Sequence, residues 1–376
     1  MIILVDENMP MAESAFAPFG EVRTAAGRSL SKQQLADVDA LLVRSVTQVD
    51  ESLLKDTPVK FVGTATIGTD HIDQSWLQQA GIGFASAPGS NARSVVEYVM
   101  AALAQLRLSR GVEFLSSSVG IIGMGNVGSS LYKTLDGLGI NVRAYDPLIP
   151  QDRYPVMTCL DEVLEADIVC LHTPLSTEGP YPSYHMLGKQ QLAKLRPGTV
   201  LLNAGRGAAI DNNALLAQLE SGQDLIAVLD VWEGEPQINT ALLPRVAIAT
   251  PHIAGYSYDG KLTATAMLQS AMASFFELQL PFAGVNDKQQ DPQLLNLPAV
   301  GCYEQLCSAI LQAYPIMDDD ARLRAMATLN AAQIGAGFDQ LRRDYPQRRE
   351  FTHFALKTPV LSELRAPMKS LGFSLL

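Results

Sequence analysis

The segment Gly-Met-Gly-Asn-Val-Gly at residues 123–128 constrains the fold of this chain more than any other feature. It directly follows an apolar stretch with the length of a strand, Val119–Ile122, and it precedes a helical pattern over 127–138. The next strand-like stretch ends at Asp146, 18 residues after the last glycine (146 − 128 = 18). A strand, three spaced glycines, a helix and an acid in this order are typical of a dinucleotide-binding βαβ unit.

Each glycine of this segment has a separate expected task. Gly123 allows a tight turn, Gly125 lets the backbone approach a pyrophosphate, and Gly128 lets the helix pack closely on its strand. Asn126 and Val127 lie at the start of the helix. Their backbone N–H groups, at the positive end of the helix dipole, can bind the phosphates. The alternative is a glycine-rich turn that binds no ligand.

The acid after the second strand indicates which nucleotide would bind. Asp146 can accept hydrogen bonds from the adenosine ribose hydroxyls, and it would repel a 2′-phosphate. Pro147, not an arginine, follows it. The sequence therefore favours NAD over NADP as the cofactor.

Short apolar stretches alternate with amphipathic ones through most of the chain, which predicts α/β domains with parallel sheets. Strands are expected at 2–5, 40–43, 60–62 and 82–85, and in a second array at 119–122, 142–145, 168–171, 200–202, 226–229 and 246–249. Helices are expected over 94–109 and 262–277, and helical patterns recur near 302–313 and 319–329. We expect two Rossmann- or flavodoxin-like doubly wound parallel-sheet domains, followed by a C-terminal α/β domain.

The same pattern divides the chain into three expected domains. A substrate-binding domain covers 1–94 and is completed by the returning segment 257–285, and an NAD-binding Rossmann domain covers 95–256. Proline and glycine in the stretch 279–293 indicate a linker. The C-terminal domain is expected over 286–376.

The composition disfavours several classes of function. The chain has 28 Lys and Arg against 39 Asp and Glu, a net charge of −11, without a long basic run, which disfavours nucleic-acid binding. No apolar run reaches the roughly 18 residues of a membrane span, and the N-terminus lacks the basic start of a signal peptide. The four cysteines form no Cys-x-x-Cys pair and have no histidine at metal-ligand spacing. We expect a reduced, cytoplasmic protein without a metal site or a membrane contact.

Three polar side chains, Arg206, Glu235 and His252, follow three strands of the second array. The carboxyl ends of parallel strands meet at one edge of the sheet, where open α/β sheets bind their ligands. Arg206 can bind a carboxylate through two parallel hydrogen bonds. His252 can take the proton of a hydroxyl, and Glu235 can hold the imidazole in one tautomer. This set suits hydride transfer from a 2-hydroxy acid.

Each of these side chains also has an ordinary structural explanation. An arginine after a strand can form a surface ion pair, and a histidine beside a proline can simply lie in a loop. Glu233 competes with Glu235 as the partner of His252. The sequence alone leaves this choice open.

With these motifs the chain resembles the D-isomer-specific 2-hydroxyacid dehydrogenases. The segments that carry the resemblance are 119–128, 171–175, 201–207, 229–236 and 250–255. The resemblance implies that Arg206 binds the substrate, that His252 transfers the proton and that Glu235 is the acid partner of His252.

The resemblance implies further contacts with the cofactor and the substrate. The residues implied at NAD, besides Asp146, are Thr173, Asp230 and Gly255. The residues implied at the substrate, a small phosphorylated 2-hydroxy acid, are Ser45, Thr66 and Tyr256. Without the resemblance, capping of strand-to-helix turns is the preferred explanation for Ser45 and Thr66. Capping explains Asp230 equally well, and Tyr256 could simply pack against a helix. The C-terminal domain is expected to join two chains in a homodimer.

A phosphorylated substrate needs a second anion site besides Arg206. Arg44, which precedes Ser45, is the nearest basic candidate. The other candidate is the C-terminal arginine cluster, of the same chain or of the partner subunit, which consists of Arg342, Arg343, Arg348 and Arg349. The alternative for this cluster is a solvated surface patch.

Two other functions stay open at this point. The chain could act on another 2-hydroxy acid, such as phosphoglycerate or hydroxypyruvate. It could also be an NAD-sensing regulator on the same scaffold, which binds the nucleotide without turnover. The complete set of Arg206, Glu235 and His252 argues against a sensor, because a sensor does not need proton transfer.

Overall fold

The computed structural model describes residues 1–280, 292–298, 301–357 and 360–376. The chain forms two compact units, and its crossings between them fall near residues 91, 256 and 291. The first unit combines Met1–Asn91 with Ser257–Asp291, and the second combines Ala92–Tyr256 with Pro292–Leu376. Most of the linker expected at 279–293 lies outside the described residues.

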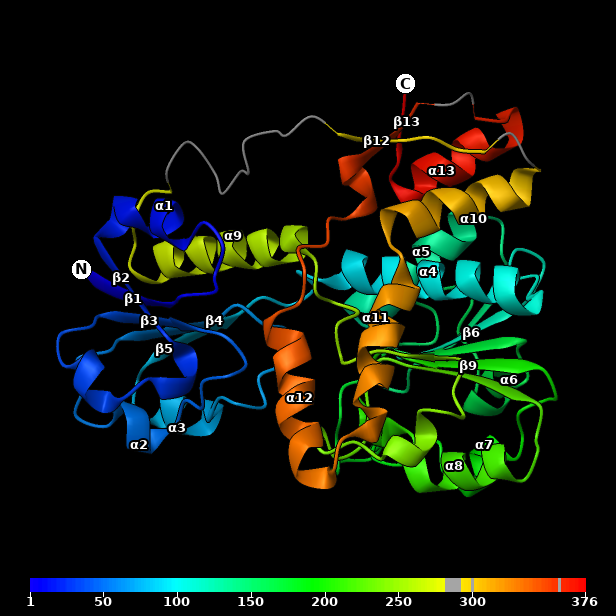
Figure 1. The fold of residues 1–376 in the computed structure, drawn as a ribbon. Helices are drawn as coiled ribbons and strands as arrows, with labels where there is room; N and C mark the ends of the chain where they lie inside the picture. The colour runs from blue at the N-terminus through cyan, green and yellow to red at the C-terminus, as the bar shows by residue number, and fades with distance from the viewer. Residues whose placement is uncertain (281–291, 299–300, 358–359) are drawn as a thin grey trace. The chain divides into compact units, whose positions relative to one another are not determined.

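The first unit is built on a five-stranded parallel sheet with the order β2-β1-β3-β4-β5 (Figure 1). Its strands are β1 (Ile2–Asp6), β2 (Glu21–Ala25), β3 (Ala40–Val43), β4 (Phe61–Thr64) and β5 (Gly83–Ser86). Its short helices are α1 (Ala12–Phe16), α2 (Glu51–Leu54) and α3 (Gln74–Gln79). The apolar runs of the sequence become β1, β3, β4 and β5, as expected for a sheet covered on both faces.

The sequence pattern does not predict β2, which lies at the edge of this sheet. Its residues are exposed or half-buried and form no apolar run, because only β1 adjoins this strand. Arg23 binds Glu21 and Asp37, with nitrogen–oxygen distances of 2.7 and 2.9 Å. Charged side chains on an edge strand discourage pairing with another sheet.

Helix α9 (Tyr258–Phe275) returns the chain to the first unit after most of the second has formed. Its Leu268 and Met272 are fully buried in one cluster with Phe61. Its Gln269 also donates a hydrogen bond to the Ala15 carbonyl (2.5 Å). The first unit is therefore discontinuous in sequence, with one core made from both segments.

The second unit contains a six-stranded parallel sheet with the order β11-β10-β9-β8-β6-β7. Its strands are β6 (Val119–Ile122), β7 (Val142–Tyr145), β8 (Ile168–Leu171), β9 (Thr199–Asn203), β10 (Leu225–Leu229) and β11 (Ile248–Ala249). Its helices before the C-terminal segment are α4 (Ala92–Arg110), α5 (Asn126–Gly137), α6 (Leu160–Leu164), α7 (Lys189–Leu192) and α8 (Asn212–Glu220). Because β7 and β8 flank β6 on opposite sides, the winding reverses at β6. The glycine-rich segment follows β6 and lies at this switch point.

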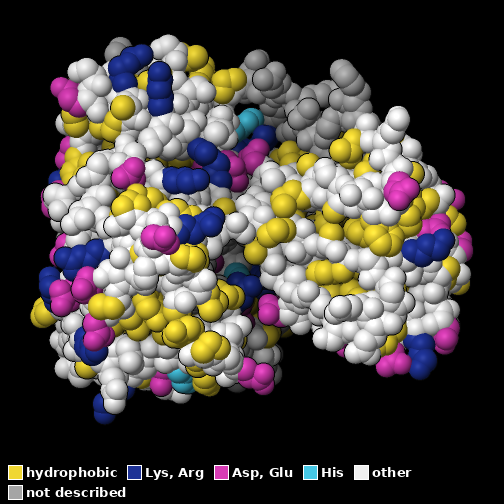
Figure 2. Space-filling model, turned by 180° about the vertical axis from the view of Figure 1, so that it is seen from behind, with side chains coloured by type: hydrophobic (Ala, Val, Ile, Leu, Met, Phe, Trp, Pro, Cys, Tyr) yellow, Lys and Arg dark blue, Asp and Glu magenta, His cyan; other side chains and the backbone are white. Residues whose placement is uncertain are grey.

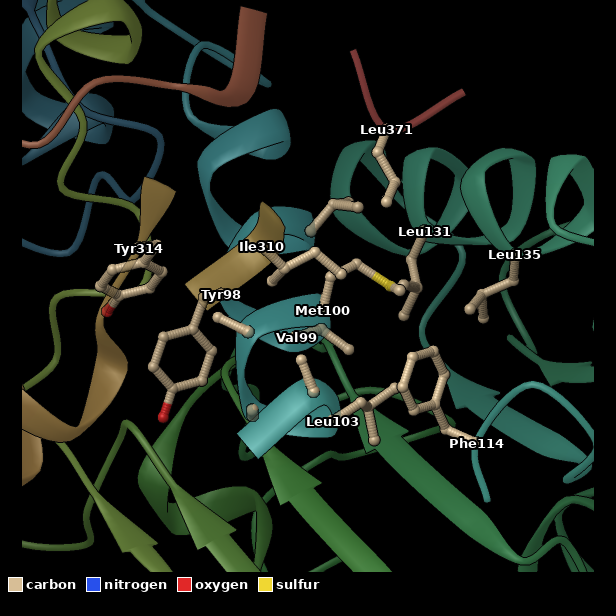
Figure 3. Close-up of a cluster of buried hydrophobic side chains, with 14 of the residues drawn as sticks. Tyr98, Val99, Met100, Leu103, Phe114, Leu131, Leu135, Ile310, Tyr314 and Leu371 are labelled. Carbon is tan, nitrogen blue, oxygen red and sulfur yellow. The ribbon is translucent and has the colours of Figure 1, made fainter. Parts of the chain in front are cut away.

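The C-terminal segment shares a hydrophobic core with the nucleotide-binding sheet and its helices. Helix α4 is buried on most of its surface, so a further layer must cover it. Helices α10 (Cys302–Ala313) and α13 (Arg365–Leu371) supply this layer by packing on α4 and α5. Figure 3 shows Ile310, Tyr314 and Leu371 of this segment beside Tyr98 and Leu131, which come from α4 and α5.

The sequence predicts three domains, whereas the structure forms two compact units. Residues 292–376 belong to the same unit as residues 92–256. The physical reason is the apolar surface of α4 and α5, which sequence periodicity assigns to no particular partner. The role of the C-terminal segment in joining two chains stays a prediction.

The C-terminal segment also contains a small parallel sheet and two further helices. The strands, in the order β12-β13-β14, are β12 (Gln293–Leu295), β13 (Phe354–Leu356) and β14 (Ser374–Leu375). The helices are α11 (Ile316–Arg324) and α12 (Ala331–Arg343). The sequence does not predict α12, because Gly335 and Gly337 weaken its helical pattern. A capping box of Asn330 and Gln333 begins this helix.

The charged side chains on the surface agree with the acidic composition. Figure 2 shows one face, on which Lys and Arg side chains stand in separate groups among acidic and apolar ones. That face carries no continuous basic stripe of the kind that binds nucleic acid. Across the described ranges, no helix is both long enough and apolar enough to cross a membrane.

The shared core predicts that the C-terminal segment and the nucleotide-binding sheet unfold together. Ile310→Ala removes three buried carbon atoms from a fully buried side chain and should cost about 2–5 kcal/mol of unfolding free energy. Denaturant unfolding monitored by circular dichroism should show the transition of the whole second unit at lower denaturant concentration. Leu361→Ala, at a side chain 39% exposed, is the control and should cost less than about 1 kcal/mol. An early transition confined to a small part of the signal would mean that the C-terminal segment unfolds alone.

Candidate active site

The glycine-rich loop between β6 and α5 leaves open space at Gly125. A Cβ on Gly128 would lie 1.9 Å from the Gly123 carbonyl oxygen, so α5 can approach β6 only without a side chain there. Gly123 itself has a φ of +93°, which favours glycine. A Cβ on Gly125, by contrast, would meet no heavy atom within 4 Å. The protein's own packing does not require this glycine, and the space beside it lies where a pyrophosphate is expected.

Asp146 is fixed to the glycine-rich loop by backbone hydrogen bonds. Its carboxylate accepts from the N–H of Met124 (2.8 Å) and from the N–H of Leu148 (3.0 Å). Asn126 and Val127 form the first turn of α5 on the other side of the same loop. Each carboxylate oxygen of Asp146 keeps a lone pair that can accept a hydrogen bond from a ribose hydroxyl.

Two residues after β8 carry buried polar atoms that lack partners. Thr173 Oγ1 and both ring nitrogens of His172 have no hydrogen bond within the part of the chain that is described. A Cβ on Gly205, in the loop after β9, would lie 3.0 Å from the backbone nitrogen of Thr173, so the two loops are in close contact. Unpaired buried polar groups are costly, and a ligand that hydrogen-bonds them removes the cost. These groups, the space at Gly125 and the carboxylate of Asp146 together fit a bound dinucleotide.

His252 and Glu235 form a direct hydrogen bond, with 2.7 Å between Nδ1 and Oε2. The other oxygen of Glu235 accepts from the Trp232 N–H (2.8 Å). Burial opposes the ionisation of Glu235, but His252 and these hydrogen bonds hold its pKa below the ordinary value. An ionised Glu235 keeps the proton of a neutral imidazole on Nδ1, which leaves Nε2 to accept another proton. The side chain of His252 is 30% exposed, so Nε2 is within reach of a ligand.

Glu233 makes a different contact and does not compete for His252. Its Oε1 lies 2.6 Å from Nε2 of His185, and its Oε2 accepts from the Asn212 N–H (3.2 Å). Nδ1 of His185 lies 3.8 Å from Asp211 Oδ2. These acidic groups and His185 could hold a metal ion, but their mutual contacts also satisfy them without one. The alternative that the sequence left open is therefore decided in favour of Glu235 as the partner of His252.

Asp230, which directly follows β10, holds the loop that carries His252 through hydrogen bonds. Its buried carboxylate accepts from Thr250 Oγ1 (2.7 Å) and from the N–H groups of Ile253 (2.8 Å) and Ala254 (3.0 Å). Its carbonyl accepts from the His252 N–H (2.7 Å). These bonds favour the loop-capping role for Asp230. Its contact with NAD stays a prediction.

Arg206 lies in the loop after β9, whose shape depends on Asn203. The amide nitrogen of Asn203 donates to the Arg206 carbonyl (3.0 Å), and its oxygen accepts from the Gly205 N–H (3.1 Å). The Arg206 guanidinium in turn donates to the Gly205 carbonyl (3.0 Å). Sequence reasoning assigned no role to Asn203, although an amide at the end of an otherwise apolar strand signals such an anchor.

The C-terminal segment supports the His252 loop from the other side. Arg348, only 8% exposed, donates to the Ala254 carbonyl (2.5 Å) and lies 4.2 Å from the ring centroid of Tyr314. Asp320 of α11 accepts from the Ala249 N–H (2.7 Å), directly before the loop. Sequence reasoning missed these supports, because they join positions 70 or more residues apart (320 − 249 = 71).

Gly255 and Tyr256 end this loop. The Tyr256 N–H donates to the Ile253 carbonyl (2.8 Å), which forms a turn. The Tyr256 ring packs edge-on against Tyr345, with 5.8 Å between centroids, and the Arg342 guanidinium carbon lies 5.7 Å from the same ring. Tyr256 therefore joins the loop to the C-terminal segment. Its contact with the substrate and that of Gly255 with NAD stay predictions.

The substrate residues expected in the first unit lie at the carboxyl ends of its strands. Arg44 and Ser45 follow β3, and Thr66 follows β4. The Thr66 hydroxyl lies 2.7 Å from that of Thr64 and donates to the Gly68 carbonyl (2.8 Å). Ligands of open α/β sheets bind at this edge, so the placement suits the expected role. Contacts of these residues with a substrate stay predictions.

Comparisons with known proteins agree with this arrangement. Residues 94–254 match the family model "D-isomer specific 2-hydroxyacid dehydrogenase, NAD binding domain", and residues 295–372 match a domain of unknown function. The chain is 46% identical to the erythronate-4-phosphate dehydrogenase of Cellvibrio japonicus over 99% of both chains. It is also 46% identical to that of Teredinibacter turnerae, over 100% of this chain and 99% of the relative.

Solved structures show the same fold over about three quarters of the chain. The NAD-bound 3-phosphoglycerate dehydrogenase of Entamoeba histolytica is 25% identical, with a TM-score of 0.64, and covers 74% of this chain and 95% of its own. The TT0316 protein of Thermus thermophilus is 23% identical, with a TM-score of 0.64, over 75% of this chain and 99% of its own.

Buried His172 predicts a specific loss of stability in acid. Burial lowers its pKa to about 4 from the ordinary 6.5, so between these values the unfolded chain binds a proton that the folded chain does not. Stability should therefore fall as the pH drops through this window, by about 3 kcal/mol from this group. Denaturant unfolding of the NAD-free protein should show that the free energy of unfolding decreases between pH 6.5 and pH 4. In His172→Gln this decrease should be smaller by this amount. An equal pH dependence in both proteins would contradict the prediction.

Proposed function

The chain belongs to the erythronate-4-phosphate dehydrogenases, within the D-isomer-specific 2-hydroxyacid dehydrogenases, and on that premise we propose that it oxidises 4-phospho-D-erythronate at C2. The product of this reaction is (R)-3-hydroxy-2-oxo-4-phosphooxybutanoate. The observation that carries the proposal is the 2.7 Å hydrogen bond between His252 and Glu235, on the same sheet as the glycine-rich loop. NAD is the cofactor of this family of enzymes.

Proton removal is assigned to His252. Its Nε2 accepts the proton of the C2 hydroxyl as the C2–H bond breaks. The imidazolium that forms keeps its Nδ1–H on the ionised Glu235, which stabilises the positive charge and holds the ring orientation. The same pair working in reverse donates a proton to a 2-keto acid.

Substrate binding is assigned to residues that can hold an anion or a hydroxyl. Arg206 is proposed to bind the C1 carboxylate, because a guanidinium forms two parallel hydrogen bonds with it. Ser45, Thr66 and Tyr256 are also proposed to bind the substrate. Arg44 is proposed as a further positive charge near the substrate.

Residues at the carboxyl edge of the second sheet are proposed to hold NAD. When bound, NAD supplies the acceptor for the hydride that leaves C2. The loop 123–128 would hold the pyrophosphate and Asp146 the adenosine ribose. Thr173 would offer a hydroxyl that has no hydrogen-bond partner among the described residues. Asp230 and Gly255 complete the proposed set near the nicotinamide.

The cellular setting belongs to the same proposal. The reaction is placed in pyridoxine 5′-phosphate biosynthesis, in the cytoplasm. The chain is proposed to work as a homodimer joined through its C-terminal segment. Identity of 46% with two erythronate-4-phosphate dehydrogenases over nearly the whole length supports this substrate over phosphoglycerate or hydroxypyruvate. The His252–Glu235 contact supports an enzyme over a sensor.

The two acids at 233 and 235 provide a matched test of the proton-transfer assignment. Glu235→Gln should lower kcat about a hundredfold or more, because a neutral amide neither holds the tautomer nor stabilises the imidazolium. Glu233→Gln removes the same charge two residues away, from a carboxylate that contacts His185, and should leave kcat within about threefold of the wild type. Steady-state NADH formation measures both. Equal losses in the two variants would overturn the assignment.

Substrate identity is tested by NADH absorbance with three acids. Rapid turnover is expected with 4-phospho-D-erythronate, and at least about tenfold lower kcat/KM with 3-phospho-D-glycerate and D-lactate. His252→Ala should abolish most of the activity while NAD still binds, because the proton has no acceptor. Preference for one of the other acids would keep the dehydrogenase and exclude this substrate. Binding of NAD without turnover of any acid, with a keto acid also present, would favour the sensor.

A further inference from the structure

One face of helix α12 lies beside residues that are close to His252 and Glu235 in the sequence. Gly335, Asp339 and Arg342 are spaced by four and three residues, so they lie on the same side of the helix. A Cβ on Gly335 would lie 2.4 Å from Nε2 of Gln237, so α12 packs directly on the segment that follows Glu235. Arg342 lies seven residues further, about 10 Å along the axis. The helix therefore connects the Glu235 segment to Tyr256.

The Arg342 guanidinium lies at the end of this face, where it is partly buried and has acidic groups nearby. Its carbon stands 5.7 Å from the Tyr256 ring centroid, and its Nε is buried without a hydrogen-bond partner among the residues the structure describes. Burial opposes its charge, but Tyr256, Glu235 and Asp339 hold its pKa above the ordinary value. A charged group with an unused donor beside the catalytic loop is suited to an anion.

Two other members of the C-terminal arginine cluster, Arg348 and Arg343, lack this combination. Two nitrogens of Arg348 also lack partners in the described part of the chain, but this side chain is 8% exposed, lies over the Tyr314 ring and donates to the Ala254 carbonyl. Arg343 is exposed and donates to Gln340 (2.9 Å). Arg348 is therefore buried in contacts that support the fold, and Arg343 faces solvent. Arg342 is half-buried beside Tyr256.

We propose that Arg342, together with the hydroxyl of Tyr256, forms the subsite for the terminal phosphate of the substrate, supplied by the same chain that carries His252. This inference rests on the proposed function, which assigns the opposite, carboxylate end of the substrate to Arg206. A guanidinium binds a phosphate through two parallel hydrogen bonds, and partial burial strengthens the attraction. Asp339, one turn before Arg342, is the group that the phosphate must displace or outweigh.

The subsite explains what the C-terminal segment contributes to specificity. Residues 94–254 carry the dehydrogenase motifs, and they include Arg206, Glu235 and His252. Arg342 comes from the segment that follows, and Ile334 and Phe338 anchor its helix α12 in a core cluster with Trp232. Recognition of the carboxylate and recognition of the phosphate are thereby assigned to separate segments of one compact unit.

The test compares Arg342→Met with Arg343→Met, which removes an exposed arginine from the adjacent position. Arg342→Met should raise KM for 4-phospho-D-erythronate about ten- to hundredfold, with a smaller change in kcat. Its kcat/KM should fall by a much smaller factor for unphosphorylated D-erythronate than for 4-phospho-D-erythronate. Arg343→Met should leave both substrates nearly unaffected. Thermal unfolding of each variant reports whether the fold is retained.

A binding measurement separates this inference from the proposed function. Inorganic phosphate, titrated calorimetrically into the NAD-loaded protein, should bind the wild type and Arg343→Met, and Arg342→Met should lose at least tenfold in affinity. This result supports the subsite even if 4-phospho-D-erythronate is not turned over, an outcome that would remove only the proposed substrate. Unchanged KM and unchanged phosphate affinity in Arg342→Met would overturn the subsite. Equal losses for both acids, or a shifted pH profile with unchanged KM, would instead show that Arg342 acts only through Glu235.

Discussion

The buried carboxylate of Asp230 is the interaction on which the rest of the active site depends. One side chain accepts three hydrogen bonds from the loop after β11, two of them from backbone N–H groups. The loop thereby becomes rigid at its first and middle residues, and His252 projects from it toward Glu235 with a φ of +56°, a conformation that the surrounding bonds must hold. Tyr98 of α4 extends the network by bonding the Thr250 hydroxyl (2.9 Å). Without this support the 2.7 Å contact of His252 and Glu235 would have no fixed geometry.

The C-terminal segment completes this support instead of standing apart as a separate body. Its apolar residues enter the core of α4 and α5, and its Arg348 and Asp320 bind the backbone on both sides of Thr250. Buried charges are stable only when they are paired or hydrogen-bonded. The hydrogen bond to the Ala254 carbonyl therefore stabilises buried Arg348, and it also stabilises the loop. A substitution in this segment is therefore expected to reach the catalytic loop through backbone hydrogen bonds.

Sequence reasoning succeeded where local pattern carries the information. Most strands of the two larger parallel sheets are buried on two faces, so they appear as apolar runs, and the glycine spacing located the nucleotide loop. It missed β2, whose edge position permits polar residues, and α12, whose Gly335 and Gly337 weaken the helical pattern. In α12 the first of these glycines is needed because Gln237 packs against the helix. Such a contact links positions almost 100 residues apart (335 − 237 = 98), and a single sequence does not contain it.

The sequence by itself determined the α/β class, the place of the glycine-rich loop and the residue types gathered at the strand ends, because hydrophobic periodicity and glycine spacing are local properties. Tertiary structure decided which acid meets His252. Glu233 and Glu235 are equivalent in sequence, but the turn after β10 directs Glu233 to His185 and Glu235 to His252. Tertiary structure also distinguished the arginines of the C-terminal cluster, burying Arg348 in the fold and leaving Arg342 beside Tyr256. These choices depend on packing between distant segments, where side-chain direction and burial are set by the whole fold.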